Sequence, residues 1–487
     1  MPLSLPGLIH CPIKNLFANI SLVVLLNLLI KPAWLLMENL VQNAVGHSDW
    51  GMYSALFSLG FLFLALADLG INQYTTKTLA SEPDKIPSHF PNLLSVKALL
   101  TLAYPFLMIG VGWLLGYRGQ ELYFLAVLCL MHGLLQIVAY FRANYQAMQR
   151  FKTDGLLSIF DRLISLLLVG FLFLTQLDIA AFIYARLVGV LLTMVIFYLA
   201  ITRLYGWLRP RLEWPLIRKM LRMSLPFAIV TVLYSVHDKV DQVMLERLYS
   251  KEETGLYVGA YRWLDAFMMY LWTVLPIFFA RFAFFIHDNR EKERLLHFGQ
   301  VICALPMIFA SVWVFFYGEH LLFLFTGSTP AQMDTMLGCL KVLFVAALIN
   351  SFFSIFSTLL TSTGYERVIN RIAGVSILLN IALNFVFIPR YGAVASAWTT
   401  VLSYLFMDLA YLIYVERRLA IRVPYGQMLR LAVAAGLLGC VFWGMGYTGW
   451  PWYAVSVVAG VVFAGAGLLL GPVARNTLGL LRRGHEK

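Results

Sequence analysis

The chain has 487 residues, of which 60% are hydrophobic and only 13% are charged, and its mean hydropathy is +0.77. A soluble domain carries about 25% charged residues, so this composition excludes a soluble protein and indicates an integral membrane protein. The net charge of +12 does not point to nucleic acid, because the basic residues gather in short connections between apolar segments.

The start of the chain and its cysteines indicate neither a signal peptide nor a metal site. The first fifteen residues carry no short apolar core followed by a small-residue cleavage site, so we expect no removable signal peptide. The five cysteines stand in or beside apolar runs without the spacing of a metal site, and we expect them to be packing residues. No cofactor and no metal ion is predicted.

Apolar segments of about 20 residues or more, long enough to cross a bilayer as helices, recur about fourteen times. They lie near residues 15–44, 50–76, 89–116, 121–149, 153–176, 179–203, 223–248, 253–284, 295–318, 336–362, 367–389, 391–416, 427–447 and 452–474. We therefore predict an all-α integral membrane protein with about 14 transmembrane helices.

Basic residues divide unevenly between the two sides of the membrane. With these spans, the termini and the connections after even-numbered spans hold about two dozen Lys and Arg, and the opposite connections about four. Because cytoplasmic loops are the basic ones, both termini are expected in the cytoplasm. A basic cytoplasmic face also suits anionic lipid headgroups.

The longest cytoplasmic connection mixes Leu and Trp with Arg and Lys, and we predict an interfacial amphipathic helix there. It separates two groups of six spans. An echo between Gly51-Met52-Tyr53 and Gly255-Leu256-Tyr257, at the starts of the second and eighth spans, favours a parallel repeat. We expect an N-terminal lobe, the connection, a C-terminal lobe, and two accessory helices with a cytoplasmic tail, at residues 1–205, 206–222, 223–420 and 421–487.

Ionisable residues at bilayer depth are costly, so we expect them to face a partner or a wet cavity. The seventh span places His237 and Asp238 near its middle and Asp241 one turn further on. The eighth span places Arg262 and Asp265 at comparable depth. These groups form either a coupling-ion or gating cluster or a structural bridge, with Asp241 level with Arg262. His237 either titrates in that cluster or bonds a neighbour.

The first half of the chain carries a second group of charges at depth. On the first span, Lys31 lies mid-span on one stripe with Trp34 and Glu38. A lysine there has no route to the surface, which favours an anion-binding role. The other basic residues that can bind an anionic headgroup are Arg142, Arg162, Arg186 and Arg262.

Some of these charges have simpler interpretations. Arg142 can instead reach the cytoplasmic surface, and Arg162 can pair with its neighbour Asp161. Asp68, on the second span, is a further candidate for ion coupling or gating. His132, alone on an apolar segment, is expected to be packed and hydrogen-bonded.

No catalytic constellation is present in the sequence. It has no phosphate-cradling glycine loop, no paired-His metal motif and no G-x-S-x-G nucleophile elbow. Its longest connections are short and basic, with no room for a soluble catalytic domain. We therefore do not expect an enzyme.

Short motifs at matching places in the two halves resemble one family. Ser224-Leu225-Pro226, Asp241-Gln242-Val243-Met244-Leu245 and Gly255-Leu256-Tyr257 resemble the S-x-P, D-x-x-x-L and G-x-Y pattern that opens the second lobe of Wzx-type polysaccharide flippases. Gly51-Met52-Tyr53 and Asp68-Leu69-Gly70 resemble the matching G-x-Y and D-L-G of the first lobe. These flippases belong to the multidrug/oligosaccharidyl-lipid/polysaccharide (MOP) exporter superfamily, and the resemblance covers essentially the whole chain.

The resemblance implies two six-helix lobes around a central cavity, plus two C-terminal helices. It implies that the protein flips an undecaprenyl-pyrophosphate-linked oligosaccharide, such as an O-antigen repeat unit, to the outer leaflet of the bacterial inner membrane. H+ or Na+ are the candidate coupling ions. A polysaccharide polymerase and chain-length proteins are the candidate protein partners.

The residues themselves agree with an anionic headgroup, because Lys and Arg pair with phosphate oxygens. The aromatic residues Trp34, Tyr257 and Tyr261 suit sugar faces. A lipid II flippase is one alternative, and a cation or drug antiporter of the same superfamily is another. From a different class, the alternatives are a polysaccharide polymerase and a membrane glycosyltransferase.

Overall fold

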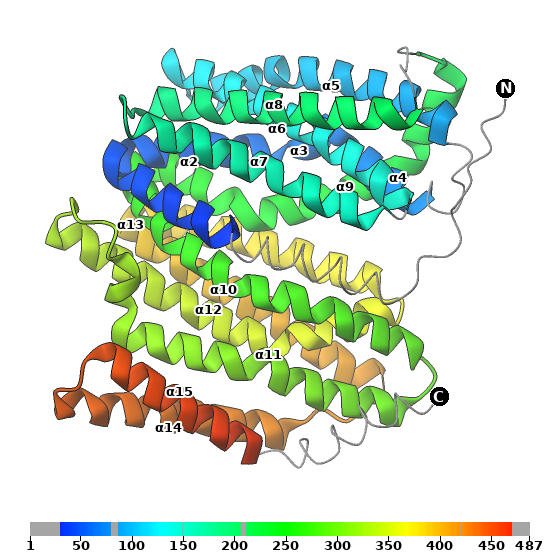
Figure 1. The fold of residues 1–487 in the computed structure, drawn as a ribbon. Coiled ribbons are helices and arrows are strands. Elements are labelled where there is room, and N and C mark those ends of the chain that lie inside the picture. Colours follow the sequence, from blue (N-terminus) through cyan, green and yellow to red (C-terminus); the bar gives the residue numbers. More distant parts are fainter. Residues whose placement is uncertain (1–29, 79–85, 149, 206–210, 420, 470–487) are drawn as a thin grey trace. The chain divides into compact units, whose positions relative to one another are not determined.

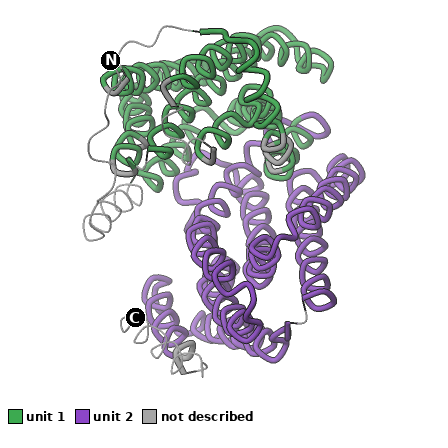
Figure 2. The backbone as a smooth tube through the Cα atoms, turned by 90° about the vertical axis from the view of Figure 1, so that its right-hand side faces the viewer, with its two compact units in different colours: residues 1–246 green, residues 247–487 purple. Residues whose placement is uncertain are grey.

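The computed structural model describes residues 30–78, 86–148, 150–205, 211–419 and 421–469, and the regular elements among them are helices (Figure 1). The chain divides into two compact units, residues 1–246 and 247–487, which Figure 2 shows in two colours. The lobes expected at 1–205 and 223–420 stay a prediction.

Unit 1 starts, in the described residues, with a helix over 30–45. The helices that follow are α2 (His47–Leu62), α3 (Leu64–Asp68), α4 (Ile71–Thr78), α5 (Ile86–Leu114), α6 (Gln120–Ala147), α7 (Phe151–Leu172), α8 (Ile179–Tyr205) and α9 (Trp214–Leu248). The boundary between the two units falls within the last turn of α9.

Unit 2 continues with long helices and two short 3-10 turns. Its elements are α10 (Lys251–Phe284), α11 (Asn289–Tyr317), η2 (Gly318–Leu322), α12 (Pro330–Ser362), α13 (Glu366–Arg418), α14 (Tyr425–Met445), η3 (Gly446–Thr448) and α15 (Trp452–Leu469). Several starts follow ordinary capping rules. The Thr329 hydroxyl accepts from the Gln332 N–H and the Gln332 side chain accepts from the Thr329 N–H, a capping box with Pro330 in the first turn.

Nine of the described helices are long and apolar enough to cross a membrane. One of them, α13, is 53 residues long and contains a break at Gly392 (φ 59°, ψ −138°). That break falls at the start of the predicted span 391–416, three residues after the predicted span 367–389 ends. The first fifteen residues of the predicted span 15–44 and the last five of 452–474 lie outside the described residues.

The second predicted span, 50–76, is interrupted twice. It is divided into α2, α3 and α4 by turns at Phe63 and at Leu69-Gly70. Leu69 (φ 50°) and Gly70 (φ 75°) both adopt the left-handed conformation. The motif Asp68-Leu69-Gly70 is therefore a turn that ends one helix and starts the next.

The connection before the seventh span differs from the prediction of a separate interfacial helix. Residues 206–210 lie outside the described residues, and residues 214–222 form the first turns of α9, which continues to Leu248 without a break. Pro215 stands in the first turn, where proline favours helix initiation. The predicted connection meets the seventh span at Arg222 to Ser224, and no glycine stands there to end the helix. The helix therefore begins earlier than the apolar pattern indicates.

Small residues bring the helices of unit 1 close together. The Thr101 hydroxyl of α5 donates to the Gly133 carbonyl of α6 over 3.1 Å, and the Tyr104 hydroxyl donates to the Gly60 carbonyl of α2. His132 lies against Gly60, and its Nε2 donates to the Phe57 carbonyl over 3.0 Å. The expectation that His132 is packed and hydrogen-bonded is confirmed.

The accessory helices α14 and α15 pack on α11 within unit 2. Trp313 Nε1 of α11 donates to Ser456 Oγ of α15 over 2.6 Å. The other side of α14 exposes Leu429, Val433 and Leu437 at helical spacing. An exposed aliphatic row is what a lipid-facing helix requires.

A bulky residue at Gly133 should separate α5 from α6. A Cβ at Gly133 would lie 2.8 Å from Thr101 Cγ2 and 3.1 Å from Thr101 Cα, and a backbone atom cannot rotate away. We expect Gly133→Val to destabilise the detergent-solubilised protein by about 1–3 kcal/mol, the usual cost of overpacking. Thermal unfolding measures this. Gly110→Val is the matched control, because a Cβ at Gly110 meets nothing within 4 Å. Equal unfolding midpoints for the two variants would contradict the close helix contact.

Candidate functional site

Three basic side chains of unit 1 lie within electrostatic range of one another. Lys31 is half-buried on the helix over 30–45, and its charge interacts with that of Arg162 on α7. Arg162 interacts in turn with Arg186 on α8. Lys31, Arg162 and Arg186 form the cationic cluster, and the structure therefore brings together residues that are far apart in the sequence.

Trp34 completes this cluster on the first helix, one turn after Lys31. The Arg186 guanidinium carbon lies 4.5 Å from the centroid of the Trp34 ring, which is cation–π geometry. The Arg186 Nε is buried and has no hydrogen-bond partner among the described residues. A buried donor without an acceptor is costly.

Two acidic side chains moderate the charge of the cluster. Glu38 lies about two turns after Lys31 on the same stripe of the first helix, and Asp161 precedes Arg162 in the chain. Both carboxylates attract the Arg162 guanidinium. Asp161 Oδ1 is buried and has no hydrogen-bond donor among the described residues. The three basic groups exceed the two acidic ones, so the site keeps a positive excess together with one available acceptor.

Arg142 on α6 is held by an ion pair. Its Nε lies 2.7 Å from Asp154 Oδ1 and its Nη2 3.3 Å from Asp154 Oδ2, and Gln146 Nε2 donates to the same carboxylate over 2.9 Å. Arg142 also lies near enough to Arg162 for their charges to interact. Its predicted role in substrate binding stays a prediction, but its charge is already compensated.

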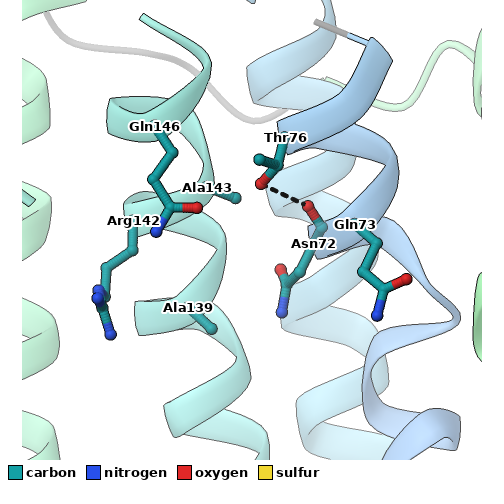
Figure 3. Close-up of a pocket in the computed structure, with 7 residues that line it drawn as sticks. All are labelled: Asn72, Gln73, Thr76, Ala139, Arg142, Ala143 and Gln146. Atoms are coloured by element: carbon teal, nitrogen blue, oxygen red, sulfur yellow. Dashed lines mark hydrogen bonds between the residues drawn. The ribbon is translucent and has the colours of Figure 1, made fainter. Parts of the chain in front are cut away.

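A pocket of about 470 Å³ lies between α4 and α6 (Figure 3). Its lining residues are Asn72, Gln73, Thr76, Ala139, Arg142, Ala143 and Gln146. Figure 3 shows Ala139 and Ala143 pointing from α6 toward α4. Arg142 thus connects this pocket to the cationic cluster.

Asp68 belongs to a buried ion pair. Lys97 Nζ on α5 lies 2.5 Å from Asp68 Oδ1 and also donates to the Gln136 carbonyl over 3.1 Å. The Asn72 N–H donates to Asp68 Oδ1 over 3.3 Å, and Asn72 Nδ2 donates to Gln136 Oε1 over 2.7 Å. Lys97 is missed by our sequence interpretation, although a lysine inside the apolar segment 89–116 is the same signal that singles out Lys31.

The predicted ion-coupling or gating residues of α9 lie in its second half, between His237 and Asp241. Asp238 is half-exposed, and its Oδ2 lies 3.4 Å from Lys239 Nζ. Asp241 is buried, and its Oδ1 accepts from the Gln242 N–H over 2.8 Å. Gln242 Oε1 accepts from the Ser58 hydroxyl of α2 over 2.6 Å, which joins this part of α9 to unit 1. His237 is half-buried on the same helix.

The predicted residues of the eighth span lie on α10, in unit 2. Tyr257 is fully buried, Tyr261 nearly so, and their ring centroids are 5.6 Å apart. The Tyr257 ring is therefore not open to a sugar in this structure. Arg262 is buried and Asp265 half-buried. The predicted bridge between Asp241 and Arg262 joins residues of different units and stays a prediction.

Within the described ranges, no three His, Cys, Asp or Glu side chains lie close enough to share a metal ion. The acids missed by our sequence interpretation, Asp154 and Glu246, lie near helix ends. Asp154 accepts from Arg142, and Glu246 accepts from the Tyr117 hydroxyl over 2.8 Å. Nothing in their sequence context distinguishes them from ordinary solvated acids.

The contribution of the Asp68–Lys97 ion pair to the stability of the protein can be tested. Removing one partner strands the other charge in the interior, which costs about 3–5 kcal/mol. We expect Asp68→Leu and Lys97→Met each to lower the unfolding temperature clearly. The double variant Asp68→Leu/Lys97→Met should recover much of the loss, because an apolar pair replaces a buried ion pair well. Additive losses in the double variant, measured by thermal unfolding in detergent, would show that the two charges do not depend on each other.

Comparison with known proteins places the chain in a family. The family model described as polysaccharide biosynthesis protein matches residues 16–280, more than half of the chain. An uncharacterized membrane protein of Methanocaldococcus jannaschii is 20% identical over 409 residues, which cover 78% of this chain and 93% of that protein.

Solved structures share the fold at low sequence identity. The lipid II flippase MurJ in an inward closed conformation is 13% identical, with a TM-score of 0.76 over 92% of this chain and 99% of that chain. An inward-facing multidrug resistance MATE family transporter of the MOP superfamily is 12% identical, with a TM-score of 0.66 over 80% of this chain and 94% of that chain. These similarities confirm the predicted all-α membrane fold. The chain belongs to the polysaccharide biosynthesis protein family and has the fold of MOP superfamily transporters.

Proposed function

We propose that this protein is a flippase that moves an undecaprenyl-pyrophosphate-linked oligosaccharide, the repeat unit of a polysaccharide, across the bacterial cytoplasmic membrane by alternating access. The observation that carries this proposal is the positive excess of the cationic cluster, in which Arg186 Nε is a buried donor without an acceptor among the described residues. Family membership and a transporter fold support the same class of activity.

A pyrophosphate fits this site chemically. Guanidinium and ammonium groups form charge-assisted bonds to phosphate oxygens, and these bonds strengthen where water is scarce. Arg186 Nε would then have an acceptor. Asp161 Oδ1 needs a donor instead, and a sugar hydroxyl next to the phosphates supplies one. A phosphate-linked glycan is a ligand that offers both.

Other functions fit less well. A cation or drug antiporter holds its ligand with acidic side chains, whereas basic groups outnumber acidic ones in the cationic cluster. A polymerase or glycosyltransferase is expected to carry a large loop with acids or histidines, and the connections in this sequence are short and basic. A lipid II flippase shares the headgroup chemistry and differs in the glycan. Deleting the gene and identifying which lipid-linked glycan accumulates in the inner leaflet separates these two.

The energy source and partners belong to the same proposal. We propose coupling to H+ or Na+, with the ion-binding or gating groups among His237, Asp238, Asp241, Asp265 and Asp68. Both termini lie in the cytoplasm in this account, because the connections on that side are the basic ones. A polysaccharide polymerase and chain-length proteins are the expected partners, since they would use the exported unit.

Lys31 gives the sharpest test of the headgroup site. We expect Lys31→Ala to reduce polysaccharide export at least about tenfold, because a charge-assisted bond contributes about 1.5–3 kcal/mol. Lys31→Arg should retain part of the activity. The measurement is the amount of surface polysaccharide in a deletion strain that carries each variant, with membrane protein levels determined alongside.

Lys341→Ala is the matched control, because it removes the same charge from α12, where Lys341 lies 5.2 Å from the Phe315 ring centroid. It should leave export near the wild-type level. Normal surface polysaccharide with Lys31→Ala at normal protein level would rule out a headgroup contact at this position.

A further inference from the structure

The pocket between α4 and α6 has a lining that differs from the cationic cluster. Its polar groups are the carboxamides of Asn72, Gln73 and Gln146, the hydroxyl of Thr76, and Arg142. No carboxylate and no aromatic ring is among the lining residues. Carboxamides and hydroxyls both donate and accept hydrogen bonds, as sugar hydroxyls do.

The charge of the pocket is nearly neutral. The only basic lining residue, Arg142, is paired with Asp154 through two contacts of 2.7 and 3.3 Å. Gln146 donates to the same carboxylate, so two polar lining residues from α6 are already bonded to Asp154, which is not itself a lining residue. A phosphate gains little from such a site, because the guanidinium charge is already compensated.

One polar atom of the lining residue Asn72 has no hydrogen-bond partner among the described residues. Asn72 Nδ2 donates a hydrogen bond to Gln136 Oε1 over 2.7 Å, but Asn72 Oδ1 is buried and has no donor among the described residues. A buried carbonyl without a donor is costly. A neutral hydroxyl or acetamido N–H satisfies it without bringing a new charge into the unit.

The size and place of the pocket fit a sugar. Its volume of about 470 Å³ lies within the range of about 300–1,000 Å³ that small-molecule sites occupy. The small side chains of Ala139 and Ala143 leave the space open on the α6 side (Figure 3). The charges of Arg142 and Arg162 interact, so the pocket adjoins the cationic cluster.

We propose that this pocket is a second subsite, which binds an uncharged sugar ring of the glycan by hydrogen bonds while the cationic cluster holds the pyrophosphate. This inference rests on the proposed function. The pocket lies near the ends of α4 and α6 that lead, in the sequence, into basic connections, the side expected to face the cytoplasm, where the glycan is loaded.

The test compares two lipids that differ only in the sugar. The purified full-length protein is titrated with undecaprenyl pyrophosphate and with the polyprenyl-pyrophosphate-linked glycan extracted from cells of the native organism, and native mass spectrometry resolves the complexes. We expect wild type to bind the glycan-bearing lipid more tightly. Gln73→Leu and Asn72→Leu should each weaken that binding about fivefold, because each removes about one hydrogen bond to the sugar. Both should leave binding of the bare lipid unchanged.

Gln120→Leu is the matched control, because it makes the same change at the other, exposed end of α6 and should alter neither affinity. Asn72→Leu also loses its bond to Gln136, so the exposed Gln73 gives the independent variant if Asn72→Leu unfolds. Equal affinity of wild type for the two lipids, or an equal effect of Gln73→Leu on both, would overturn the sugar subsite and leave the flippase proposal standing. Wild type that binds neither lipid would overturn both.

Discussion

An ionised group in a bilayer must have an opposite charge, hydrogen bonds or water, and this constraint accounts for two ion pairs of unit 1. Asp68 and Lys97 satisfy each other at 2.5 Å, and Arg142 and Asp154 at 2.7 Å. Both pairs lie between helices that must pack together. The cationic cluster differs, because its basic groups are not matched one to one by acids. Incomplete pairing is what separates a candidate site from a structural pair here.

The packing of the helices makes this separation possible. Where Gly60 and Gly133 face their neighbours, helices approach closely enough for the hydroxyls of Tyr104 and Thr101 to bond backbone carbonyls. Such contacts hold α2, α5 and α6 in fixed positions. The first helix, α7 and α8 contribute the cationic cluster, and the same α6 that packs rigidly through Gly133 presents Ala139 and Ala143 to the polar pocket.

The sequence predicts the helical membrane fold and the approximate spans because both depend on local apolar length. It also singles out Lys31, Arg162 and Arg186 as candidate headgroup ligands, and the structure brings their charges within range of one another. It does not reveal that Lys97 forms an ion pair with Asp68 or that Asp154 forms one with Arg142, because the choice of partner depends on which helices become neighbours. The continuous start of α9 is likewise missed, because one helix can leave the bilayer without any change in its backbone.

The central claim is that the cationic cluster binds a pyrophosphate and not an organic cation. The most direct measurement is calorimetric titration of the purified protein with geranylgeranyl pyrophosphate and, separately, with tetraphenylphosphonium. We expect the protein to bind the pyrophosphate only, and to bind it more weakly as salt is raised, because salt screens the charges in a wet site. Binding of tetraphenylphosphonium without binding of the pyrophosphate would contradict it.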